Sequence, residues 1–91
     1  MTYQEILQDA LSHAADRHDI HSGAIYAKSR RQPAIWARQD VQLFMWLHEI
    51  KLEAIAQEFD CDRATVHSNV RAAALRLLRN SCEKALQHTP T

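Results

Sequence analysis

The sequence has few of the residues on which turns and disulfides depend. Its 91 residues include one glycine, two prolines and two cysteines. An all-β fold needs many turns rich in Gly and Pro, so this shortage disfavours it, whereas an apolar content of 46% is too high for a disordered tail. Cys61 and Cys82 are too few for a disulfide framework and suit a reducing compartment. Length and composition therefore predict one helical domain over residues 1–91.

Long apolar runs are missing as well. No stretch approaches the ~20 apolar residues of a membrane-spanning helix, and the first residues are too polar to form a signal peptide. We therefore expect a soluble, cytoplasmic protein that makes no contact with a membrane.

Motifs for catalysis, cofactor binding and metal binding are also absent. The six histidines form no His-Glu-x-x-His, the cysteines form no Cys-x-x-Cys, and there is no Gly-rich phosphate-binding loop. Histidines such as His13, His18 and His21 are therefore expected at the solvated surface. Cys61 precedes a predicted helix, whose dipole favours a thiolate, but no His–acid pair can be placed beside it. The sequence predicts no enzyme activity, no cofactor and no metal, and Cys82 is expected to be a half-buried thiol.

Charged residues balance overall but are unevenly distributed. Eleven basic and eleven acidic residues give a formal net charge of zero. Residues 1–20 and 39–62 carry net charges of −3 and −5, whereas residues 28–38 and 63–84 each carry +4. A folded molecule with this pattern could present one positive face, as nucleic-acid-binding proteins do. The alternative is that the charges scatter in space and cancel.

Helical spacing of apolar residues begins close to the N-terminus. Thr2 and Glu5 have the spacing of a capping box before a first helix over about 3–18. Ser22 is placed to cap a short second helix that ends near Ser29.

Three more helices follow. Pro33 suits the first turn of a third helix that runs to about His48. A two-turn helix is expected over about 52–59, and Asp62 can cap the last helix. The third helix is expected to form the centre of the core through Ile35, Trp36, Leu43, Phe44 and Leu47, with Trp46 either extending that core or marking a partner surface. In the last helix the residues expected to face inward are Val66, Val70, Ala73, Leu77 and Leu78. No segment has the pattern of a strand, so the predicted fold class is all-α with five helices.

The last two predicted helices have the spacing of a helix-turn-helix over about 52–80. A short helix is followed by a three-residue turn and a longer helix that begins Arg-Ala-Thr-Val. If Val66 and Val70 face the core, the opposite side of the first turns faces outward, and it carries Arg63, Ala64, His67, Ser68 and Arg71. Recognition helices read base edges in the major groove with such residues. An ordinary helical hairpin with a solvated polar face is the alternative.

Residues from about 15 to 75 resemble the C-terminal DNA-binding domain of the bacterial replication initiator DnaA, whose fold is similar to that of the Trp repressor. The resemblance rests on the order of five motifs: Ser-Gly-Ala-Ile, Lys-Ser-Arg-Arg-Gln-Pro, Arg38-Gln39, Leu-Glu-Ala-Ile-Ala-Gln-Glu-Phe and Asp-Arg-Ala-Thr-Val. It implies a regulator that binds specific double-stranded DNA in replication initiation or transcription control. It also implies replication-initiation proteins as further partners.

The same resemblance implies roles for single residues. Arg30, in the basic loop with Lys28 and Arg31, matches an arginine that enters the minor groove, and Arg38 matches one that reaches a phosphate. The family's signature reads Arg-Asp-His-Thr-Thr-Val, and its Asp, His and first Thr contact bases. The chain matches it with Asp62, Thr65 and Val66, has Arg63 in place of His and Ala64 in place of the first Thr, and carries Glu53 where the family often has Pro. The turn is one residue shorter than in the family.

Other interpretations stay open at the level of sequence. The second half alone is similar to generic bacterial regulators, including sigma-factor region 4 and response-regulator helix-turn-helices. A protein-interaction module that acts on the initiator without reading bases would fit the zero net charge and the acidic segment 39–62. A homodimer is a further expectation, because helix-turn-helix proteins often pair to read two half-sites, and the acidic first helix could form the contact.

Overall fold

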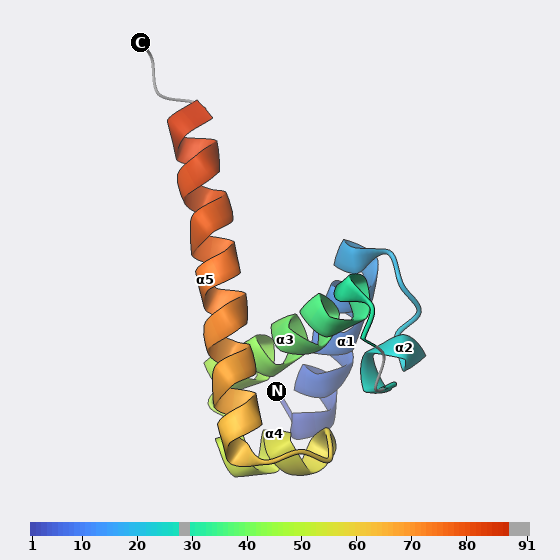
Figure 1. The fold of residues 1–91 in the computed structure, drawn as a ribbon. Helices are drawn as coiled ribbons and strands as arrows, with labels where there is room; N and C mark the ends of the chain where they lie inside the picture. Colours follow the sequence, from blue (N-terminus) through green and yellow to red (C-terminus); the bar gives the residue numbers. More distant parts are fainter. Residues whose placement is uncertain (28–29, 88–91) are drawn as a thin grey trace.

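The computed structural model describes residues 1–27 and 30–87, and within these ranges it contains helices and no strand (Figure 1). The helices are α1 (Tyr3–His18), α2 (Gly23–Tyr26), α3 (Gln32–Leu47), α4 (Leu52–Glu58) and α5 (Arg63–Gln87). The predicted all-α class with five helices is confirmed. Lys28 and Ser29, predicted to lie in the basic loop and at the end of the second helix, fall outside the described residues.

Helix starts follow the predicted caps at two places and differ at a third. The Thr2 hydroxyl accepts a hydrogen bond from the Glu5 backbone N–H at 3.2 Å, and the Asp62 carboxylate accepts one from the Thr65 N–H at 2.7 Å. The prediction that Ser22 caps the second helix is wrong: its backbone is already helical, and the Gly23 N–H donates to Nδ1 of His21 at 3.0 Å. A capping side chain needs an extended backbone at its own position, which Ser22 does not have.

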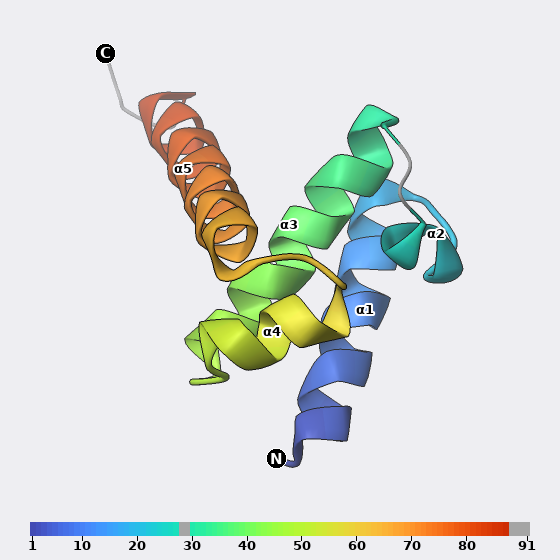
Figure 2. The same ribbon diagram turned by 60° about the horizontal axis from the view of Figure 1, so that its bottom comes forward.

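The core lies where α3 packs between α1 and α5, with α4 closing one end (Figures 1 and 2). Its fully buried apolar side chains are Ile25, Ala37, Val41, Met45, Ile55, Val66 and Ala73. Small residues on α1, including Ala10 and Ala14, are buried against this cluster, so the helix backbones approach closely. The apolar residues at helical spacing in α1 are all buried, and α4 buries Ile55 and Ala56.

The predicted apolar stripe of α3 is partly wrong. Trp36, Trp46 and Leu47 are exposed, and the helix buries Ala34, Ala37, Val41, Gln42, Leu43 and Met45 instead. The small side chains occupy the closely packed centre, while the Trp36 ring lies at its edge with the Arg76 guanidinium 5.3 Å above it. Because α3 is apolar on more than one side, spacing alone did not identify the side that packs.

Helix α5 is much longer than its contact with the other helices. Its 25 residues span about 37 Å, and its C-terminal half projects beyond α1–α4 (Figure 1). Leu78 and Cys82 were expected inside or half inside, and both are exposed because no other helix reaches them. Among the described residues, no helix has the length and apolar character needed to cross a lipid bilayer.

Candidate nucleic-acid interface

Helix α4 and the turn after it hold the first two turns of α5 against the core (Figure 2). Ile55 and Ala56 of α4 are buried, and Val66 and Val70 of α5 are buried on the facing side. Asp60, in the turn, has a φ of 51°, the left-handed conformation that reverses the chain between the two helices. The start of α5 therefore has one face fixed to the protein and the other free to meet a partner.

The residues predicted to face outward from α5 do so. Arg63, Ala64, Thr65, His67, Ser68 and Arg71 are all exposed. The buried pair Val66 and Val70 fixes which side of the helix they occupy, as the sequence predicts. This exposed side is called the α5 polar face below, defined by Arg63, Ala64, His67, Ser68 and Arg71.

Two residues near the α5 polar face already have partners within the protein. Asp62 caps the helix, and hydrogen bonds from the Thr65 hydroxyl and the Thr65 N–H lower the pKa of its carboxyl. Arg63 forms an ion pair with Glu53 of α4 at 3.2 Å, and both side chains are more than half exposed. An exposed ion pair of this kind is weak, so Arg63 can exchange Glu53 for another anion. The carboxylate of Asp62, by contrast, is bonded to the first turn of α5.

The described arginines of the basic loop and Arg38 differ in their surroundings. Arg30 and Arg31 are exposed, and Lys28 lies outside the described residues. Arg38, expected to reach a phosphate, is half-buried: its Nε donates to the Ile25 carbonyl at 2.9 Å and a terminal nitrogen donates to the Ala27 carbonyl. It therefore ties α3 to the end of α2 and sets the direction in which the chain enters the basic loop.

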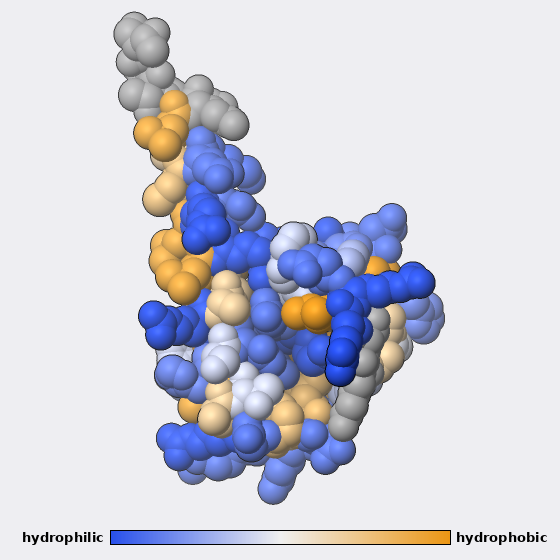
Figure 3. All heavy atoms as spheres, in the orientation of Figure 1, coloured by the Kyte–Doolittle hydropathy of each residue, from blue (hydrophilic) through white to orange (hydrophobic). Residues whose placement is uncertain are grey.

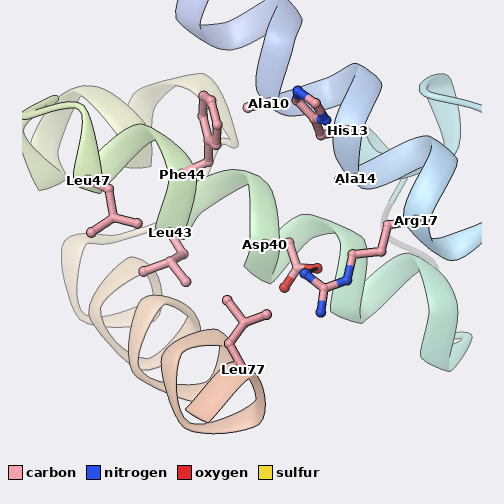
Figure 4. Close-up of a pocket in the computed structure, with 9 residues that line it drawn as sticks. All are labelled: Ala10, His13, Ala14, Arg17, Asp40, Leu43, Phe44, Leu47 and Leu77. Atoms are coloured by element: carbon pink, nitrogen blue, oxygen red, sulfur yellow. Dashed lines mark ion pairs between the residues drawn. The ribbon is translucent and has the colours of Figure 1, made fainter. Parts of the chain in front are cut away.

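A partly buried charged network joins α1, α3 and α5, and the sequence did not reveal it. The Asp40 side chain is 10% exposed; it accepts a hydrogen bond from Arg76 and lies 2.7 Å from Nε2 of His18. Asp40 also lies 3.8 Å from Arg17, and Figure 4 shows these two side chains pointing toward each other. Arg76 also donates to Oε1 of Gln39 at 2.7 Å. The expectation that His18 is solvated is wrong, since its ring is held between helices by Asp40.

This network changes how the charged segments should be interpreted. Arg76 belongs to the basic segment 63–84 and Asp40 to the acidic segment 39–62, and the two neutralise each other inside the fold. The cations left exposed on α5 include Arg71, on the polar face, and Arg79 and Lys84, nearer its C-terminal end. Counting charges along the sequence could not separate internal ion pairs from charges that face a partner.

Glu58 fixes the far end of α4. Its carboxylate accepts hydrogen bonds from the hydroxyls of Tyr3 at 2.7 Å and Tyr26 at 3.1 Å, and the Tyr26 ring stacks on Phe59 at 5.2 Å between centroids. Partial burial and then the Glu58 carboxylate raise the pKa of Tyr26 to about 12 and raise that of Tyr3 as well. The two tyrosines thus connect α1 and α2 to the helix that supports α5.

The titration of Tyr26 tests this arrangement. The pKa of Tyr26 in the folded protein lies above the ordinary tyrosine value of 10.0, so the unfolded chain releases the proton first. The stabilisation is complete below pH 10 and is lost as the pH rises towards 12. Phenolate absorbance should therefore show no titration midpoint near pH 10 while the protein is folded. Glu58→Gln should lower the midpoint, whereas Glu83→Gln, on the exposed part of α5, should not. Equal midpoints in Glu58→Gln and wild type would contradict the role of Glu58.

A small groove lies between α1, α3 and α5. It encloses about 140 Å³ and is lined mainly by apolar side chains, including Leu43, Phe44 and Leu77, with Arg17 and Asp40 at one end (Figure 4). The Arg17–Asp40 contact occupies the polar end, so the groove offers no pair of free acid and base groups. Within the described parts of the chain, no three His, Cys, Asp or Glu side chains come together as a metal site would require.

The geometry thus leaves the predicted side of α5, the α5 polar face, exposed, while Arg38 bonds α3 to the end of α2. The sequence identified the residues of that face but not the internal partners of Arg38 and Arg76. No protein-family model, curated protein or solved structure matches the chain.

Proposed function

We propose that the protein is a regulator that binds specific double-stranded DNA, similar to the C-terminal domain of the initiator DnaA, and acts in replication initiation or transcription control. In this proposal α4 and α5 act as a helix-turn-helix, and α5 is the recognition helix. The observation that carries the proposal is the α5 polar face, whose residues are all exposed while Val66 and Val70 anchor the opposite side. A helix held in this way can enter the major groove with its first two turns.

The residues of the polar face supply the chemistry that base edges and phosphates require. Arg63 and Arg71 can form bidentate hydrogen bonds with guanine or bind phosphates, and Ser68 and His67 can bond either. Glu53 holds Arg63 in the free protein, and the weak, exposed pair would open when a phosphate or base replaces the carboxylate. Because Asp62 caps α5, its role is to fix the helix start rather than to contact a base.

The basic loop would contact the DNA backbone beside the groove. Arg30 and Arg31 are exposed at the start of α3. Arg38 then acts as a positioning residue, because its bonds to the Ile25 and Ala27 carbonyls direct the chain into the loop. Phosphate contacts of this kind fix the register of a protein on DNA without reading its sequence.

The deciding experiment is fluorescence anisotropy with labelled duplexes at about 50 and 200 mM salt, where each phosphate contact contributes to the loss of affinity. One duplex carries a DnaA-box sequence and the other a scrambled version. We expect binding that weakens at least about tenfold over this salt range, and a flatter salt dependence for Arg30→Ala because one counterion fewer is released. Lys84→Ala, a change of the same charge near the far end of α5, should leave the slope unchanged. Absence of binding to both duplexes at micromolar protein would overturn the proposal.

A second candidate function is a protein-interaction module without base readout. It is favoured by Trp46 and Leu47, two large apolar side chains exposed next to each other at the end of α3. If this function holds, Trp46→Ala abolishes capture of a replication-initiation protein while Arg63→Ala leaves it intact. If DNA binding holds instead, Leu47→Ala leaves the anisotropy of both duplexes unchanged; Leu47, unlike Trp46, does not line the hollow beside His67 and Arg71.

A further inference from the structure

The C-terminal half of α5 carries an exposed apolar stripe. Leu75, Leu78 and Leu86 are 51%, 62% and 75% exposed, and Cys82 is exposed as well. At about 100° per residue these four side chains fall within an arc of about 80°, on the side of the helix opposite Val66. Figure 3 shows apolar residues gathered along the outer edge of the projecting helix, with hydrophilic residues beside them. The stripe therefore faces away from the core.

This part of α5 is little covered by the other helices. Every residue from 78 to 86 is exposed, and the segment extends beyond the other helices (Figure 1). Most of the stability of helices in proteins comes from the packing of an amphipathic face. A partner that covers the stripe would supply that packing.

We propose that a second copy of this chain covers the stripe, with the two α5 helices side by side and antiparallel. Leu75, Leu78, Cys82 and Leu86 are separated by steps of three and four residues, the spacing of the apolar seams along which helices pair. A copy of the same helix offers a seam of the same length and spacing, and a two-fold axis lets both copies bury it at once. The pairing goes beyond DNA binding and does not depend on it, whereas the choice of direction rests in part on keeping the α5 polar face open for DNA.

Arg71 determines the direction of the pair. It lies on the same side of α5 as the stripe, one turn before Leu75, and is exposed. Parallel helices would bring the two Arg71 side chains together and cover Ser68. An antiparallel pair centred near Asn80 avoids both results, because each polar face then lies beyond the end of the other helix.

Charges beside the stripe match the antiparallel pair as well. Arg79 and Glu83 lie on the same flank of the stripe, and both are exposed. In a two-fold antiparallel pair the same flank of each helix meets, so each Arg79 comes near the partner's Glu83. In the same arrangement Leu78 faces the partner's Cys82 near the centre.

Sedimentation velocity at increasing concentration tests the pairing. The wild-type chain should shift from monomer to dimer between about 1 and 100 μM, a range typical of modest interfaces. Leu78→Glu should stay monomeric, because it places two carboxylates in the apolar seam. The matched control is Leu47→Glu, since Leu47 is 63% exposed on α3 and lies off the stripe; it should dimerise like wild type. The proposal would be overturned if the wild-type chain stayed monomeric at the upper concentration. It would also be overturned if Leu47→Glu failed to dimerise while Leu78→Glu still formed dimers.

Oxidative crosslinking tests the direction. In the antiparallel pair the two Cys82 residues lie on either side of the centre, more than the ~7 Å between Cα atoms that a disulfide allows. Leu78→Cys introduces a thiol opposite the partner's Cys82, so this variant should form a disulfide-linked dimer much faster than wild type, and adding Cys82→Ser should slow it again. Cys61 is present in all three proteins and cannot cause the difference. Equally fast crosslinking of wild type would instead indicate parallel helices and would overturn the antiparallel arrangement.

Discussion

Replacing Asp40 with alanine is expected to lower the free energy of unfolding by about 3–5 kcal/mol, the usual cost of breaking a buried charge pair by removing one partner. The change leaves Arg76 with a largely buried charge and takes away the hydrogen-bond partner of His18, so α1, α3 and α5 lose their shared polar contact. Urea unfolding followed by circular dichroism measures the loss directly. A domain of this size should also lose at least about 12 °C in Tm.

Two control variants distinguish the loss of the Asp40 network from the effect of removing a carboxylate in general. Asp9→Ala removes an exposed acid from α1 and should change the stability by less than about 0.5 kcal/mol. Asp40→Asn keeps the size of the side chain and an acceptor for Arg76, so its cost should lie between those of Asp9→Ala and Asp40→Ala. If Asp40→Ala unfolds within about 1 kcal/mol of wild type, Asp40 does not hold the three helices together.

Local features of the fold were predictable because local physics determines them. The capping spacing of Thr2 and Glu5, the cap at Asp62 and the inward spacing of Val66 and Val70 depend on residues three or four positions apart. For the same reason the sequence identified the α5 polar face before its position in the fold was known.

Contacts between distant residues were not predictable in the same way. Asp40 meets His18 across 22 residues and Arg76 across 36, and nothing in the spacing of a single helix indicates such partners. The errors on Trp36 and Leu78 have the same origin: an apolar residue at helical spacing is buried only if another helix lies over it. Where α5 extends past the other helices, the pattern of a buried stripe persists without the neighbour that would cover it.

The exposed leucines of α5 also have a functional interpretation. Leu75 and Leu78 lie on the same side of α5 as Ser68 and Arg71. This side of the helix is therefore polar near its N-terminal end and apolar further along. Such a division suits a helix whose first half meets DNA and whose second half meets another copy. DNA binding and helix pairing share Arg71 but otherwise use different residues, and their tests can fail independently.

Ser68→Glu is expected to weaken binding to duplex DNA by at least about 100-fold. Ser68 lies in the middle of the α5 polar face, and a carboxylate there would oppose the phosphates on both sides of the groove, a juxtaposition of like charges that costs several kcal/mol. Because the side chain is exposed, the stability of the fold should be nearly unchanged, which circular dichroism can confirm. The measurement is anisotropy of the labelled duplex at about 50 mM salt.

Ser81→Glu provides the matched control, since it makes the same chemical change at an exposed position of the same helix, more than three turns further on and off the apolar stripe. Both variants change the net charge of the protein by the same amount, so a general electrostatic effect would weaken the DNA binding of both equally. A loss confined to Ser68→Glu would mean that DNA approaches the first turns of α5. Equal losses of DNA affinity in the two variants would mean that the attraction between protein and DNA is diffuse and that α5 does not enter the groove. Normal DNA binding by Ser68→Glu would mean that the α5 polar face is not part of the interface.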